Sequence, residues 1–147
     1  QDNPSGLHTC FYRDQDQVVA HCSFREQHCG YEGMVHGGVI SALLDEALGR
    51  IVASITGKMV MTGELTVRFH QPVPVTATVE ISAGVDDYQR RPNLFTSASG
   101  VMIDQASRQK YASAKGRFVA IPEEKYDRIL TTLRLEGQER SVTLADL

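Results

Sequence analysis

Apolar and polar residues alternate over most of this chain. In the clearest run, from Val75 to Val85, every second residue is apolar, and the residues between them are Thr, Glu, Ser or Gly. A period of two is typical of a β-strand with one buried face. Two short runs, 7–11 and 18–24, flank a polar segment and predict a hairpin. Further alternating runs predict strands at 60–70, 94–104 and 111–120.

The stretch from Gly38 to Thr56 has a different pattern. Its apolar residues cover nearly the whole circumference of a helix instead of one stripe, which predicts a helix buried on most sides. The last predicted strand places small residues on its inner face, from Ala112 to Ala120, so a bulky element is expected to pack against it. The sequence therefore predicts an α+β fold in which one antiparallel sheet curls around a central helix.

A second, peripheral helix is expected near the C-terminus. Pro122 precedes two glutamates, which is typical of a helix start. Apolar residues then follow at helical spacing, and beyond Glu136 the pattern fades into a tail. We divide the chain into one domain at 5–121 and a short amphipathic C-terminal helix with its tail at 122–147.

Composition narrows the class of protein. The chain has 147 residues, 41% of them hydrophobic, and a formal net charge of −3, so one folded domain is expected and neither nucleic acid nor a membrane is expected as a partner. Three cysteines and no apolar run of membrane-spanning length favour a reducing, cytoplasmic location. The first residue is Gln rather than Met, which is compatible with a removed N-terminal segment.

The candidate chemistry lies where a loop enters the buried helix. His36, Gly37 and Gly38 stand at the helix start, where the first backbone N–H groups lack intrahelical partners. Glycine permits close approach, so a carbonyl oxygen could be stabilised there as it becomes an oxyanion. The simpler alternative is that the two glycines only allow a tight turn.

Asp45 strengthens the functional interpretation. It lies two turns into an otherwise apolar helix and faces small residues that run back to Gly38. A buried carboxylate is seldom placed there unless it is paired or functional. Its neighbour Glu46 has Arg50 at i+4, which predicts an ordinary ion pair. Asp45 is therefore a candidate general base or nucleophile at a carbonyl, the alternative being a core Asp satisfied by the backbone.

The stretch from Gly33 to Gly49 resembles the signature of hotdog-fold acyl-CoA thioesterases of the phenylacetic-acid-degradation type. Segments 62–73 and 112–119 resemble the third and last strands of that family, and the resemblance covers about residues 5–121. It implies a hotdog fold and hydrolysis of an acyl-CoA thioester to a free acid and coenzyme A. Coenzyme A is then part of the substrate, and no separate cofactor is expected.

The resemblance also implies roles for individual residues. Asp45 matches the base or nucleophile, and the N–H of Gly37 matches the oxyanion donor. His36 matches a histidine that organises the loop more than it exchanges protons. Thr62 matches a residue that positions the attacking water in some members. The phosphates of coenzyme A are expected at the helix start around Gly38 and at two adjacent arginines, Arg90 and Arg91, whose guanidinium groups suit bidentate contacts.

One departure concerns the loop before His36. Some members carry an Asn or Gln there as a second carbonyl donor, but this chain has Gly30 near that place, so either Gln27 substitutes or the donor comes from elsewhere. In this family the site forms between two subunits. The resemblance therefore implies a homodimer or a dimer of dimers, with Asp45 of one chain facing the Gly37 loop of another.

Three other functions compete with hydrolysis. His21, Cys22, His28, Cys29 and His36 have ligand-type atoms, but adjacent strand residues point to opposite faces, so we expect no metal site. A non-catalytic acyl-CoA-binding module would have little use for Asp45. A hotdog hydratase or dehydratase would need a His and acid pair that is not evident. The identity of the acyl chain, and whether Asp45 acts as base or nucleophile, are left open by the sequence.

Overall fold

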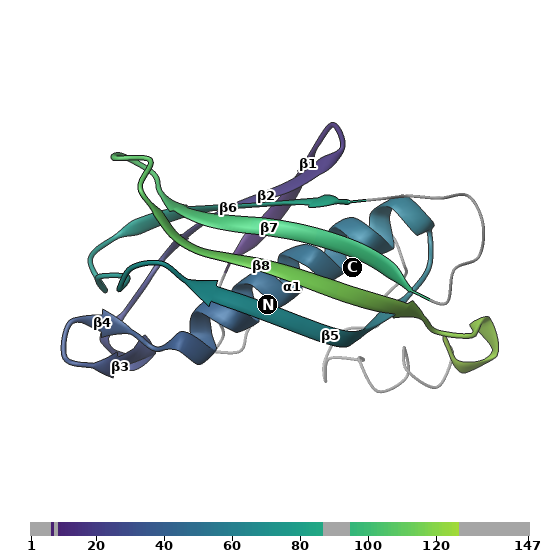
Figure 1. Ribbon diagram of the computed structural model, residues 1–147, viewed down its shortest axis with the longest axis horizontal. Coiled ribbons are helices and arrows are strands. Elements are labelled where there is room, and N and C mark those ends of the chain that lie inside the picture. The colour runs from purple at the N-terminus through teal and green to yellow at the C-terminus, as the bar shows by residue number, and fades with distance from the viewer. Residues whose placement is uncertain (1–6, 8, 87–94, 127–147) are drawn as a thin grey trace, which may run out of the picture.

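A six-stranded antiparallel sheet curls around one long helix in the computed structural model, which describes residues 7, 9–86 and 95–126 (Figure 1). The strand order is β1-β2-β6-β7-β8-β5. The helix α1, Gly37–Thr56, packs against β2, β5, β6, β7 and β8, and it also meets β1, where Nη1 of Arg13 donates to the hydroxyl of Ser54 over 2.8 Å. The sheet strands are β1 Cys10–Asp14, β2 Gln17–Ser23, β5 Val60–Phe69, β6 Thr78–Val85, β7 Thr96–Asp104 and β8 Lys110–Ala120.

A small two-stranded hairpin precedes α1. It consists of β3, Cys29–Tyr31, and β4, Met34–Val35, after the 3₁₀ turn η1, Glu26–His28. It is tied to the loop before β6 because the N–H of Val35 donates to the carbonyl of Val73 over 2.9 Å. This hydrogen bond fixes the hairpin at the N-terminal end of α1, near the large sheet (Figure 1).

The predicted α+β architecture is confirmed, and the differences concern boundaries. The predicted N-terminal hairpin forms, but β1 and β2 extend to Asp14 and Gln17, so its turn is shorter than the polar segment suggested. The run from Val75 begins outside the sheet, and β6 starts only at Thr78. Ala120 alternates with buried Phe118 and so lies on the inner face as predicted, but it is exposed at the end of the strand.

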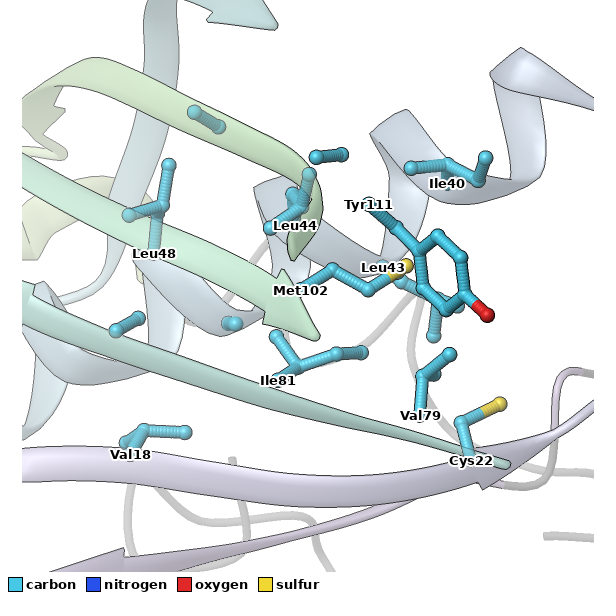
Figure 2. Close-up of a cluster of buried hydrophobic side chains, with 14 of the residues drawn as sticks. Val18, Cys22, Ile40, Leu43, Leu44, Leu48, Val79, Ile81, Met102 and Tyr111 are labelled. Atoms are coloured by element: carbon cyan, nitrogen blue, oxygen red, sulfur yellow. The ribbon is translucent and has the colours of Figure 1, made fainter. Parts of the chain in front are cut away.

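The core lies between α1 and the concave face of the sheet. Leu44, Leu48 and Ile51 of the helix are fully buried. Figure 2 shows side chains of α1 meeting those of β6 and β7, with Tyr111 of β8 beside them. Ala112 and Ala114 on β8 are almost fully buried, so their small size lets the helix approach the sheet as predicted.

One side of α1 remains uncovered. Gly38, Ala42 and Glu46 are exposed, and Asp45 and Gly49 are half-buried. These positions follow one another at helical spacing, so they form one stripe along the helix. The prediction of a helix buried on most sides is therefore wrong for this stripe within a single chain. We call the stripe, with the neighbouring edge strand β5, the open side of α1.

The predicted C-terminal helix is described only at its start. Pro122 precedes the 3₁₀ turn η2, Glu123–Lys125, and the N–H of Met59 donates to the hydroxyl of Tyr126 over 3.2 Å. Residues 127–147 lie outside the described residues. Over the part of the chain that is described, none of the helices has the length and apolar character needed to span a membrane.

Candidate active site

His36 caps the N-terminus of α1 with its side chain. Its backbone is extended, with φ −64° and ψ 136°, and its Nδ1 accepts the N–H of Gly38 over 2.9 Å. Because Nδ1 is the acceptor, the neutral ring carries its proton on Nε2. The cap satisfies one of the N–H groups that a helix start leaves unpaired. The contact supports the loop-organising role that the resemblance implied for His36, which stays a prediction.

The two glycines after His36 make room for side chains of this same chain. A Cβ on Gly38 would lie 2.8 Å from Nδ1 of His36, and a Cβ on Gly37 would lie 3.3 Å from Cζ of Phe69. The imidazole and the phenyl ring therefore occupy the space that the glycines leave. The sequence predicted that a ligand would approach the two glycines closely, and in this structure the side chains of His36 and Phe69 lie against them.

Gly37 keeps an uncommitted backbone donor. The N–H of Gly38 goes to His36, and those of Val39 and Ile40 go to the carbonyl of His36. Within the described residues, no acceptor is recorded for the N–H of Gly37. Of the two glycines predicted to bind ligand, only Gly37 thus has a donor free at the positive end of the helix. A developing oxyanion is the kind of group that this end favours.

Asp45 and Thr62 meet on the open side of α1. The hydroxyl of Thr62 donates to Oδ1 of Asp45 over 2.9 Å. Thr62 precedes a β-bulge at Gly63, because Thr62 pairs with Phe118 while Glu64 pairs with Arg117. Thr62 thus lies on the helix-facing side of β5, opposite buried Phe118. The bulge shifts the alternation by one residue, so Glu64 points outward while Leu65 and Val67 pack against the core. The sequence placed Thr62 in this strand but could not reveal the hydrogen bond.

The carboxylate of Asp45 is held but not covered. Asp45 is half-buried in the single chain rather than buried as predicted. Within the described residues, Oδ2 has no recorded partner, since Thr62 takes Oδ1. Oδ2 is therefore available to accept a proton from a water on the open side of α1.

The other titratable side chains considered for catalysis or metal binding have local structural partners away from Asp45. The predicted ion pair forms, with Nε of Arg50 2.7 Å from Oε1 of Glu46. His21 hydrogen-bonds the hydroxyl of Tyr12, and Nδ1 of buried His28 accepts the N–H of Arg25. Across residues 7, 9–86 and 95–126, no three His, Cys, Asp or Glu side chains gather as a metal site would require.

The departure before His36 has a steric reason. A Cβ on Gly30 would lie 2.8 Å from Cδ2 of His36, so an Asn at this place would displace the capping ring. Gln27 is exposed in the turn η1. Arg90 and Arg91, expected to contact phosphates of coenzyme A, lie outside the described residues.

Two residues at the site carried no usable signal in the sequence. Phe69 was expected only as one apolar residue on an alternating strand, yet its ring lies over Gly37 while 52% of its surface stays exposed. The carbonyl of His28 accepts the N–H of His36 over 2.8 Å and so ties the loop together. Neither contact follows from residue spacing, because both join segments that only the tertiary fold brings together.

Comparisons with known proteins agree with this architecture. The family model described as Thioesterase superfamily matches residues 32–91. Acyl-coenzyme A thioesterase THEM4 of Bos taurus is 31% identical over 122 residues, which are 82% of this chain and 48% of that protein. The chain thus spans about half the length of this curated relative.

Solved structures share the fold at low sequence identity. The Escherichia coli PaaI protein from the phenylacetic acid degradation operon superposes with a TM-score of 0.70 at 19% identity, covering 79% of this chain and 81% of that one. A Streptococcus mutans protein bound to acetyl CoA gives 0.68 at 18% identity, covering 77% and 88%. These structures show that the fold is a hotdog fold. The bovine relative, 31% identical over 82% of this chain, shows that the chain belongs to the thioesterase superfamily, which confirms the resemblance.

Proposed function

We propose that this chain is an acyl-CoA thioesterase domain that hydrolyses the thioester to a free acid and coenzyme A. The observation that carries the proposal is the Asp45–Thr62 hydrogen bond on the open side of α1. It holds a carboxylate at an accessible position on the helix whose N-terminus offers the free N–H of Gly37. The THEM4 relative is named an acyl-coenzyme A thioesterase, and the Streptococcus mutans neighbour was solved with acetyl CoA, which supports this substrate class.

The two groups cannot act on one carbonyl within a single chain. Gly37 and Asp45 lie eight positions apart on α1, which is about 12 Å along the helix axis. The free N–H groups of a helix point out of its N-terminus, so a carbonyl held by Gly37 lies beyond the helix start, on the side away from Asp45 of the same chain. A second chain with its helix antiparallel to the first would bring its Asp45 beside Gly37, and its Gly37 beside Asp45. We therefore include a homodimer in the proposal.

The reaction follows from these positions. Water attacks the thioester carbonyl carbon and gives a proton to Oδ2 of Asp45, while the N–H of Gly37 from the partner chain holds the oxyanion. Collapse of the tetrahedral intermediate breaks the C–S bond and releases coenzyme A as thiolate. Thr62 holds the carboxylate through Oδ1. Direct attack by Asp45 through a mixed anhydride is the alternative route.

Replacement of Asp45 tests the proposal. We expect Asp45→Ala to lower kcat by about 10²–10⁴-fold, the range for loss of a general base, while the fold and the oligomeric state are retained. Thiol release is measured over short, medium, long and aryl acyl-CoA substrates, which also identifies the preferred acyl group.

Glu46→Gln provides the matched control. Glu46 is the next residue on α1, is exposed and pairs with Arg50, so its loss should leave hydrolysis close to wild type. Near-wild-type hydrolysis by Asp45→Ala for every accepted substrate would show that the mechanism is wrong.

A further inference from the structure

The outer face of the sheet, turned away from α1, carries a hollow that the proposed reaction does not use. Its volume is about 570 Å³, which lies within the usual range for a small-molecule site. The outward residues that form it come from β5, β6, β7 and β8, with Gln17 of β2 at one end. We call it the outer hollow.

Small residues at the centre of the sheet create the hollow. Ser82, Ser99 and Ser113 lie on β6, β7 and β8, with Gly84 beside them. Val101 lies between Ser82 and Ser113, and Ser99 lies between Gly84 and Lys115, so side chains no larger than valine occupy the centre and the longer charged ones stand at its edges. The hydroxyls give the floor hydrogen-bonding groups: that of Ser113 lies 2.9 Å from Nε2 of His70, and that of Ser99 donates to Asp86. Val101 adds an apolar patch.

One rim of the hollow is cationic. Lys115 of β8 pairs with Thr66 of β5, and Arg68 pairs with Ser113, so the two cations are diagonal neighbours about 7–8 Å apart at Cα. Within the described residues, neither has a carboxylate at ion-pair distance. Two unpaired cations above a floor of hydroxyls favour a dianion with several oxygens, such as a phosphate ester.

The opposite rim carries one acid. Asp86 lies at the end of β6 and accepts the hydroxyl of Ser99. Asp86 lies two strands from β8 and two residues beyond Gly84, which is in register with Ser99 and Lys115. Its Cα is therefore about 12 Å from that of Lys115 and farther from that of Arg68. A carboxylate at that distance from Lys115 suits a ligand whose far end carries hydroxyl or amino donors. A nucleoside monophosphate has both ends at roughly this separation.

We propose that the outer hollow binds a phosphate ester with a hydroxyl- or amino-bearing body, of the nucleoside monophosphate class. The phosphate lies between Arg68 and Lys115 and accepts the hydroxyl of Ser113, whose oxygen lies 2.9 Å from Nε2 of His70, and the body extends past Val101 and Ser99 toward Asp86. The proposal is independent of thioester hydrolysis, because the hollow is on the face of the sheet opposite to α1.

Titration of the full chain with AMP, followed by backbone amide NMR at low salt, tests the proposal. We expect saturable shifts at Ser82, Ser99 and Ser113, weaker binding of inorganic phosphate at the same amides, and none with adenosine. Arg68→Gln and Lys115→Gln should each weaken AMP binding about tenfold, the loss expected for one charged hydrogen bond.

Two exposed cations outside the hollow serve as controls. Arg108, which pairs with Glu80, and Lys110 at the start of β8 should be replaceable by Gln with AMP binding unchanged. Absence of shifts up to about 10 mM AMP, equal shifts with adenosine, or equal weakening by the control variants would overturn the proposal. So would a change in sedimentation with Arg68→Gln or Lys115→Gln in place of weaker AMP binding, because the face would then join copies of the chain.

Discussion

The capping contact of His36 favours a positioning role for this side chain over a role in proton transfer. Its Nδ1 accepts the N–H of Gly38, so the ring orients the helix start that carries the N–H of Gly37. A side chain with an acceptor at a similar place can perform this function, whereas a proton-transfer group needs a titratable nitrogen.

Replacement of His36 by alanine and by asparagine distinguishes the two roles. We expect His36→Ala to lower the free energy of unfolding by about 0.5–2 kcal/mol through loss of the cap, and to lower hydrolysis. His36→Asn should recover most of both, because Asn is a good N-cap residue. Urea unfolding and thiol release provide the measurements. A stable but inactive Asn variant would instead assign His36 to proton transfer.

The hydroxyl of Thr62 acts through Asp45. Removal of the hydroxyl in Thr62→Val should leave the strand in place, since Val is favoured in strands, and should lower kcat about tenfold by releasing the carboxylate. Thr62→Ser keeps the donor and should stay within about twofold of wild type. Equal kcat for the Val variant and the wild type would contradict this positioning role.

The elements themselves are held by turns whose chemistry is local. In the β7–β8 turn, Oδ1 of Asp104 accepts the N–H of Ser107 over 2.7 Å and its hydroxyl over 2.9 Å, and Oδ2 accepts the hydroxyl of Tyr111. Hydrogen bonds to its carboxylate hold the pKa of Asp104 below its usual value, and the N–H of Ser107 makes the largest contribution. The ionised form therefore stabilises the hairpin.

Stability of this turn should depend on pH. Because the folded pKa of Asp104 is lower than the unfolded value of about 4, its stabilisation is complete above that value and is lost as pH falls through the folded pKa. We expect the Tm advantage of the wild type over Asp104→Ala to shrink as pH falls from about 7 to about 3. Asp104→Asn does not titrate, so its Tm difference from Asp104→Ala should not vary with pH through this residue.

At the scale of the whole molecule, the open side of α1 and the edge strand β5 belong together. Strand β5 ends the sheet order, and Phe69 and Met61 on it are 52% and 61% exposed. An edge strand of this length with exposed apolar groups is a template for pairing with another chain. A second copy placed there would cover the same side of α1 that the proposed two-chain site requires.

A charged residue on the open side tests this assembly. Ala42 is exposed in the single chain, so Ala42→Arg should fold normally, yet it would place like charges together where two antiparallel helices meet. We expect loss of the dimer in sedimentation and a parallel loss of kcat/KM. Thr76→Arg, at an exposed position before β6, serves as the control. An active monomer would exclude the two-chain site.

The sequence by itself determined the elements and their chemistry. Alternation at period two located the strands, the apolar helix pattern located α1, and Asp45 stood out because a carboxylate rarely occurs in such a helix. These features are local, and each follows from residues within a few positions of one another.

Only the tertiary structure decided what these residues touch. The Thr62–Asp45 bond joins β5 to α1, and the ring of Phe69 reaches Gly37 from the end of β5. The tertiary structure also decided the burial of residues on α1, since the sheet covers one side of the helix and Asp45 lies on the other. Contacts between distant segments depend on strand order and register, and the alternation of one strand states which face is apolar but not which strand lies beside it.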